Sequence, residues 1–121
     1  MTARYSFASH EEFLAEFSLE IPENYNFAFD FLDAMARIEP EKIAMVHVDD
    51  QGERREYDFG YFAAQSARLA NALAARGLVR GDRVMLVLHR RVEFWVSILA
   101  LHRLGAVAVP SPALLTAKDI Q

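Results

Sequence analysis

The fold is decided by residues 81–112, which read GDRVMLVLHRRVEFWVSILALHRLGAVAVPSP. The run at 83–88 is short, apolar and without strict alternation, which is typical of a parallel strand buried on both faces. Residues 92–104 form a longer apolar segment and predict a helix that is mostly buried. We expect Trp95, in the first half of this helix, to lie in the core.

A second strand follows the helix. Gly105 stands where a left-handed cap ends many helices. Residues 106–109 are again apolar and predict a strand, which we expect Pro110 and Pro112 to end. Strand, helix and strand within about 30 residues predict a parallel βαβ unit with a right-handed crossover.

The composition limits the class of protein. The chain has 121 residues, of which 53% are hydrophobic and 25% charged, as in a water-soluble globular domain. Its net charge of −4 argues against a nucleic-acid surface, and no apolar run is long enough for a transmembrane segment. Cysteine is absent, which excludes disulfides and fits a reducing compartment, so we expect a cytoplasmic location.

The rest of the chain predicts three helices and a hairpin. Ser9, Asn26 and Asp58 are each placed to cap the start of a helix. The expected helices span 10–17, 27–38 and 59–76, and the expected hairpin strands span 43–48 and 53–57. Gly77 is a plausible end for the third helix.

The inward faces of these helices follow from a 3.6-residue period. In the segment 27–38 the expected outward residues are Asp30, Asp33 and Arg37. The expected apolar stripe of this segment is Phe27, Phe31, Ala34, Met35 and Ile38. In the segment 59–76 the expected inward residues are Phe62, Leu69, Ala70 and Leu73.

Two groups of residues are candidate sites. His89, Arg90 and Arg91 follow the carboxyl end of a buried strand, where open α/β sheets bind ligands, and could hold an anion. A solvated loop explains them equally simply, and we favour it. Asp49 and Asp50 could suggest a metal or an acid–base pair, but we favour a hairpin turn because no further ligand lies at a useful spacing.

Other signatures of chemistry are missing from the sequence. The five glycines are isolated, and no glycine-rich phosphate loop occurs. The four histidines never pair at helical metal-site spacing, and no serine stands in a nucleophile elbow. We therefore assign no catalytic residue and no metal site.

Several segments resemble motifs of the adenylate-forming enzymes. REYDF at 55–59 resembles their first core motif, GDRV at 81–84 the start of their next strand, and LGAVAVP at 104–110 their second core motif. YNFAFD at 25–30 and LTAKDI at 115–120 resemble the AMP-forming acyl-CoA synthetases of the medium-chain or acetyl-like branch. His89 and Val92 depart from the pattern, since relatives commonly have prolines there.

The resemblance implies a fold and an activity. It implies α/β architecture, with N-terminal helices, a β-hairpin and a parallel βαβ unit forming part of a large N-terminal domain. It also implies a ligase that activates a carboxylic acid, expected to be a fatty acid, with ATP to an acyl-adenylate and transfers it to coenzyme A. ATP, Mg²⁺ and coenzyme A are implied for the full-length enzyme, whereas the motifs that bind them lie downstream, so this piece is expected to bind no cofactor and to be inactive.

The domain organisation follows from the same comparison. Residues 1–24 are expected to be a lead-in with a short helix, and 25–121 a partial N-terminal subdomain. Residues 116–119 look like the start of another helix, so we expect an N-terminal piece whose partner is the rest of the same polypeptide. In the isolated piece we expect exposed apolar residues and self-association. The candidates for this exposed surface are Phe94, Trp95, Ile98 and Leu101.

Two other classes remain open. The chain could be a stand-alone interaction or regulatory module derived from the same fold. It could also be a small nucleotide-binding protein of the flavodoxin or Rossmann type, although the missing phosphate loop argues against this.

Overall fold

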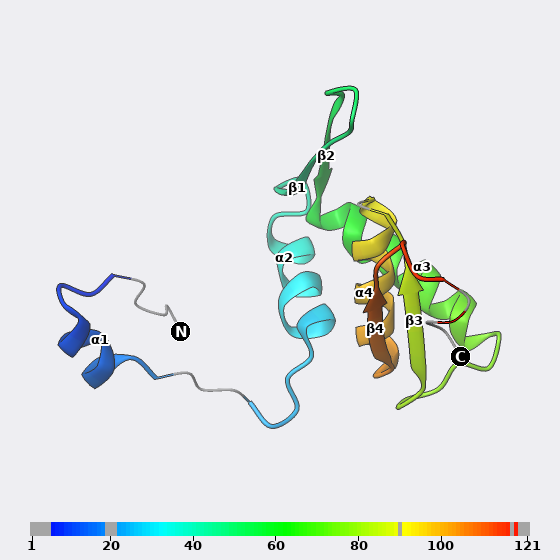
Figure 1. The fold of residues 1–121 in the computed structure, drawn as a ribbon. Helices are drawn as coiled ribbons and strands as arrows, with labels where there is room; N and C mark the ends of the chain where they lie inside the picture. The colour runs from blue at the N-terminus through cyan, green and yellow to red at the C-terminus, as the bar shows by residue number, and fades with distance from the viewer. Residues whose placement is uncertain (1–5, 19–21, 90, 117, 119–121) are drawn as a thin grey trace.

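The computed structural model describes residues 6–18, 22–89, 91–116 and 118, and Figure 1 shows their arrangement. The described part mixes helices with one antiparallel and one parallel pair of strands, which confirms the predicted α/β class. In chain order the elements are α1 (His10–Glu16), η1 (Phe27–Leu32), α2 (Asp33–Ile38), β1 (Ile43–Val48), β2 (Arg54–Asp58), α3 (Phe59–Ala74), β3 (Arg83–Val87), α4 (Val92–Leu104) and β4 (Val107–Ser111).

The βαβ unit is confirmed. Strands β3 and β4 are parallel and in contact, and α4 connects them over the predicted residues. Gly105 has φ 65°, and its N–H bonds the His102 carbonyl at 3.1 Å, as in a left-handed helix end. The predicted end of the second strand is wrong, because β4 continues through Pro110 to Ser111. Among the described residues, β4 pairs only with β3 and is therefore an edge strand. A proline is tolerated on an edge strand because the N–H that it lacks would have no strand to bond on the free side.

The sheet β3–β4 is covered on one face. Side chains at alternate positions, among them Val84, Leu86 and Ala108, pack against α3 and α4 through contacts with Leu73 and Leu101. Both helices lie on the same side of the sheet (Figure 1). The other face carries four apolar side chains that are 37–48% exposed, and we call these residues the open sheet face: Met85, Val87, Val107 and Val109.

The expected exposed surface on α4 is therefore partly wrong. Leu101 is only 1% exposed because it lies between α4 and the sheet. Phe94 and Ile98 are partly buried in the same cluster. Trp95 is 51% exposed, which confirms its place on the list of exposed residues and shows that its expected place in the core is wrong.

The helix predicted at 27–38 has a different inner face. Its first half is the π-helix η1, whose i→i+5 hydrogen bonds turn the side chains away from a 3.6-residue period. Ala28 and Leu32 are consequently the buried residues, and Phe27 and Phe31 are exposed. The predicted apolar stripe is thus wrong, because other residues of the segment face the core. Asn26 caps the helix as expected, accepting a hydrogen bond from the Ala28 N–H at 3.0 Å.

The hairpin and α3 agree with the sequence. Strands β1 and β2 are antiparallel, and the Asp58 carboxylate accepts a hydrogen bond from the Tyr61 N–H at 2.6 Å at the start of α3. Of the expected inward residues of α3, Phe62 and Ala70 are buried. Ser66 is also fully buried, which the sequence did not indicate.

The N-terminal part forms the expected short helix. The Ser9 hydroxyl accepts a hydrogen bond from the Glu12 N–H at 3.2 Å, and α1 buries none of its residues. The division of the chain after residue 24 stays a prediction. The expected helix start at 116–119 lies outside the described residues in two of its four positions. Within the described part, no helix combines the length and apolarity needed to cross a lipid bilayer.

Candidate functional site

The first candidate site lies at the carboxyl end of β3. His89 and Arg91 are exposed and line a wide groove between the β1–β2 hairpin and the start of α4, whereas Arg90 lies outside the described residues. Arg91 is the N-cap of α4 and makes no capping hydrogen bond with its side chain. Trp95 and Met45 line the apolar part of the groove.

Two charged residues of this groove, Asp49 and Arg55, have hydrogen-bond partners within the hairpin. The Asp49 carboxylate accepts hydrogen bonds from the N–H groups of Gln51 at 3.0 Å and Glu53 at 2.8 Å. The bond from Glu53 lowers the pKa of Asp49 below its usual value, and the carboxylate thus stabilises the turn. Arg55 donates to the Glu53 carboxylate at 2.8 Å, which raises the pKa of Arg55. None of these contacts involves the side chains of His89 or Arg91, and an anion site at these two residues stays a prediction.

The second candidate is a polar cluster that sequence reasoning missed. Arg103, near the end of α4, donates two hydrogen bonds to the Asp33 carboxylate of α2, one of them 2.8 Å long. The Arg103 Nε donates to the Ser66 hydroxyl of α3 at 3.0 Å, and the guanidinium carbon lies 5.3 Å from the centroid of the Phe29 ring. Three helical segments thus meet at one arginine, whose side chain is only 9% exposed.

The cluster corrects one prediction directly. Asp33 was expected to face outward, but its carboxylate turns toward α4 and is 31% exposed. A signal was present in the sequence, because an arginine within an otherwise apolar helix is almost never buried without a partner. The sequence could not show which acidic residue pairs with Arg103.

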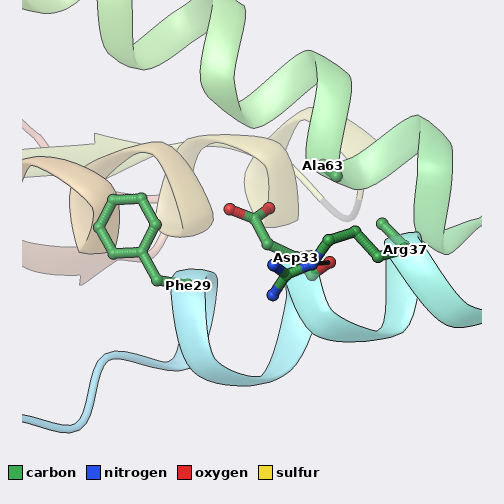
Figure 2. Close-up of a pocket in the computed structure, with 5 residues that line it drawn as sticks. Phe29, Asp33, Arg37 and Ala63 are labelled. Carbon is green, nitrogen blue, oxygen red and sulfur yellow. Dashed lines mark hydrogen bonds between the residues drawn. The ribbon is translucent and has the colours of Figure 1, made fainter.

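A shallow hollow lies beside this cluster. Figure 2 shows Phe29, Asp33 and Arg37 along η1 and α2, with Ala63 on the facing helix α3. The Arg37 Nε donates to the Asp33 backbone carbonyl at 3.2 Å, so Arg37 bonds within its own helix.

The groups in the cluster are fully engaged with one another. Both oxygens of Asp33 accept from Arg103, and the Ser66 hydroxyl donates to the Phe62 carbonyl at 2.6 Å. Ser66 has no base beside it, and an arginine does not lose its proton in a protein. The cluster joins η1–α2 to α3 and α4 and offers no nucleophile or acid.

The described residues do not fit Mg²⁺ and a nucleotide. Among residues 6–18, 22–89, 91–116 and 118, no three His, Cys, Asp or Glu side chains lie close enough to hold a metal ion. Four glycines have positive φ, but each stands alone in its own turn, so they do not build a phosphate loop. No step of nucleotide chemistry is therefore assigned to these residues.

Comparison with known proteins decides the family. Residues 32–121 match the model of the family described as "AMP-binding enzyme". The chain belongs to this family. The match begins at the end of η1 and includes the hairpin, α3 and the βαβ unit.

Proteins similar to this chain include acyl-CoA ligases and related enzymes. The mouse (Mus musculus) protein "Acyl-coenzyme A synthetase ACSM3, mitochondrial" is 36% identical over 121 residues, which is 95% of this chain and 21% of that protein. The solved Mycobacterium tuberculosis fatty acyl CoA synthetase has TM-score 0.67 and 30% identity, covering 78% of this chain and 18% of that one. The Klebsiella oxytoca NpsA N-terminal subdomain has TM-score 0.64 and 27% identity, covering 74% of this chain and 22% of that one.

These relatives confirm the resemblance and correct one expectation. The chain spans about a fifth of the length of the curated relative it matches, and it is similar to an N-terminal segment of adenylate-forming enzymes. The mouse relative is a mitochondrial protein. This finding contradicts the cytoplasmic location expected from the missing cysteines, and that expectation is wrong.

Proposed function

We propose that the whole protein, of which this chain forms the N-terminal segment, is an AMP-forming acyl-CoA synthetase. Its net reaction joins a carboxylic acid to coenzyme A and converts ATP to AMP and pyrophosphate. The observation that supports this proposal is the alignment of 95% of the chain with an acyl-coenzyme A synthetase. A fatty acid is the proposed substrate class, in line with the name of the M. tuberculosis enzyme.

We assign this chain an architectural part in the activity. Its β3–α4–β4 unit begins a parallel sheet, and the Arg103 cluster fixes η1–α2 against α3 and α4. ATP, Mg²⁺ and coenzyme A are held by residues of the longer protein in this proposal. The 121-residue chain by itself is inactive.

The test is an assay of the whole purified protein. Incubation with ATP, Mg²⁺, coenzyme A and saturated fatty acids of increasing length should give AMP and the matching acyl-CoA, both identified by mass spectrometry. Reactions that lack the acid or coenzyme A are the controls for background hydrolysis. Formation of ADP instead of AMP, or no acyl-CoA with any acid, would contradict the proposal.

A stand-alone interaction module is the second candidate. It would be favoured by a 121-residue chain that is a monodisperse monomer, melts cooperatively and binds no hydrophobic dye. The open sheet face argues against it, because apolar surface of this kind is normally covered in a complete domain.

A further inference from the structure

The charges of the chain are segregated along the sequence. Residues 6–24 contain five glutamates and neither lysine nor arginine, whereas residues 59–89 contain four arginines and a single acidic residue, Asp82. The Asp82 carboxylate accepts a hydrogen bond from the Val79 N–H at 2.9 Å and so serves its own loop. The net charge of −4 is therefore the sum of an acidic and a basic region.

The acidic region is an arm that stands away from the rest of the molecule. We call residues 6–18 and 22–24 the arm. Its helix α1 buries none of its residues and lies apart from the other helices and strands in Figure 1. The ring of Phe13 contacts those of Phe7 and Phe17, with centroid distances of 5.3 and 4.9 Å. Phe13 and Phe17 nevertheless stay 37% and 49% exposed, so the arm presents glutamates beside uncovered aromatic rings.

The basic region carries exposed arginines along α3 and just beyond it. Arg68 lies on α3, Arg76 follows the end of this helix, and Arg80 lies in the loop before β3; we call these three residues the arginine row. Within the part of the chain that the structure describes, none of the three forms an ion pair. Arg76 donates to the Ala72 carbonyl of α3 at 3.2 Å. The arginine row is thus a basic surface without carboxylate partners among the described residues.

We propose that the arm of one copy of the protein docks on the arginine row of a second copy. A guanidinium group pairs well with a carboxylate and also stacks on an aromatic ring. Arg103 makes both contacts within this chain, with Asp33 and with the ring of Phe29. An arm of glutamates and phenylalanines offers the arginine row the same two kinds of partner. Association between copies does not depend on the proposed reaction.

The positions of the two surfaces favour a second copy as the partner. In Figure 1 the arm leaves η1 on the side that faces away from the loop between α3 and β3. The segment η1–α2 and the βαβ unit lie between the two surfaces in this view, so docking within one copy would require the arm to fold back across them. Reciprocal exchange of two arms needs no such change and closes a two-fold dimer.

The test is sedimentation velocity of the whole protein with charge-reversal variants. Glu16→Arg with Glu23→Arg reverses the charge of the arm, and Arg68→Glu with Arg76→Glu reverses that of the arginine row. All four side chains are exposed, and α1 buries nothing, so these variants should keep the fold. A third variant combines the four changes in one chain.

The expected result is association that depends on opposite charges. The unchanged protein should self-associate at low salt, and each reversal should raise the dissociation constant at least about 10-fold, because like charges then face each other. The chain with all four changes should associate again. The matched control is Arg37→Glu with Glu41→Arg, at exposed positions of α2 and the following turn, and it should change the dissociation constant by less than about two-fold.

Three results would overturn the proposal. They are a whole protein that stays monomeric at low salt up to its solubility limit, association that neither reversal weakens, and failure of the combined variant to restore association. The loss of association in either single reversal with its return in the combined variant would support it. None of these readouts requires catalysis, so an associating but inactive protein would refute the proposed function and leave the docking of the arm standing.

Discussion

Replacing Asp33 by asparagine tests the Arg103 cluster most sharply. Asp33→Asn keeps the shape of the side chain but removes the negative charge, and the Arg103 guanidinium, 9% exposed, is left without its counter-ion. Hydrogen bonds to charged groups contribute about 1.5–3 kcal/mol each, and breaking a buried ion pair costs about 3–5 kcal/mol. Because Asp33 is 31% exposed and water can reach it, we expect a loss of folding stability below that of a fully buried pair, about 2–3 kcal/mol.

The assay is urea unfolding followed by circular dichroism at low temperature. With a urea dependence of about 1–3 kcal/mol per molar, the midpoint should fall by about 1–3 M. Arg37→Ala is the matched control, since Arg37 is exposed and its Nε bonds a backbone carbonyl of its own helix. That control should change stability by less than about 0.5 kcal/mol.

A double-mutant cycle isolates the pair itself. Arg103→Met removes the cation, and combining it with Asp33→Asn should cost clearly less than the sum of the two single changes. Equally mild effects of Asp33→Asn and Arg37→Ala, or additive effects of the two cluster variants, would refute the reasoning.

Three further outcomes are expected. The side-chain carboxyl of Asp49 should titrate by NMR below its usual midpoint of about 3.9, because the Glu53 N–H bonds its charged form. The turn contact should therefore be fully present above that pH and be lost as the pH falls through the lowered pKa; a midpoint at or above 3.9 would contradict this. Gly105→Ala should destabilise the protein by about 1–2 kcal/mol and by more than Gly77→Ala does. Both glycines have positive φ, but only at position 105 would the new Cβ meet the Arg80 side chain, at 3.0 Å. Equal costs of the two changes in urea unfolding would refute the role of this contact. The isolated chain should bind a hydrophobic dye or sediment as dimers, and Val107→Lys should reduce either signal more than Val79→Lys does.

Local patterns in the sequence predicted the elements well. The apolar runs at 83–88 and 92–104 and the cap Gly105 gave β3, α4 and the helix end nearly to the residue. The caps Asn26 and Asp58 were also placed correctly. Each of these features depends on a few neighbouring residues, which a single sequence displays directly.

Features that depend on contacts between distant segments were missed. The pairing of Asp33 with Arg103 joins residues 70 positions apart, and no periodicity indicates it. The π-helical turn of η1 changed which residues face inward, because a 3.6-residue period no longer applies. Trp95 was expected in the core because an apolar helix is usually covered all round, but the described elements cover it on only part of its surface.

The candidate site was the least predictable part. His89 and Arg91 were placed correctly at the carboxyl end of a parallel strand, and they line a groove with the hairpin. The position of these two residues follows from the order of strands and helices. Which ligand they could bind depends instead on the other residues that line the groove. The sequence therefore located the loop but did not determine its chemistry.

ATP–pyrophosphate exchange is the most direct test of the central claim, that this chain supplies the start of the fold and the longer protein supplies the chemistry. Radiolabelled pyrophosphate is incubated with ATP, Mg²⁺ and a fatty acid, in parallel with the 121-residue chain and with the whole protein. We predict acid-dependent exchange with the whole protein and none above the blank with the chain alone. Exchange by the chain alone, purified free of host ligases, or no exchange by the whole protein with any carboxylic acid, would contradict the account.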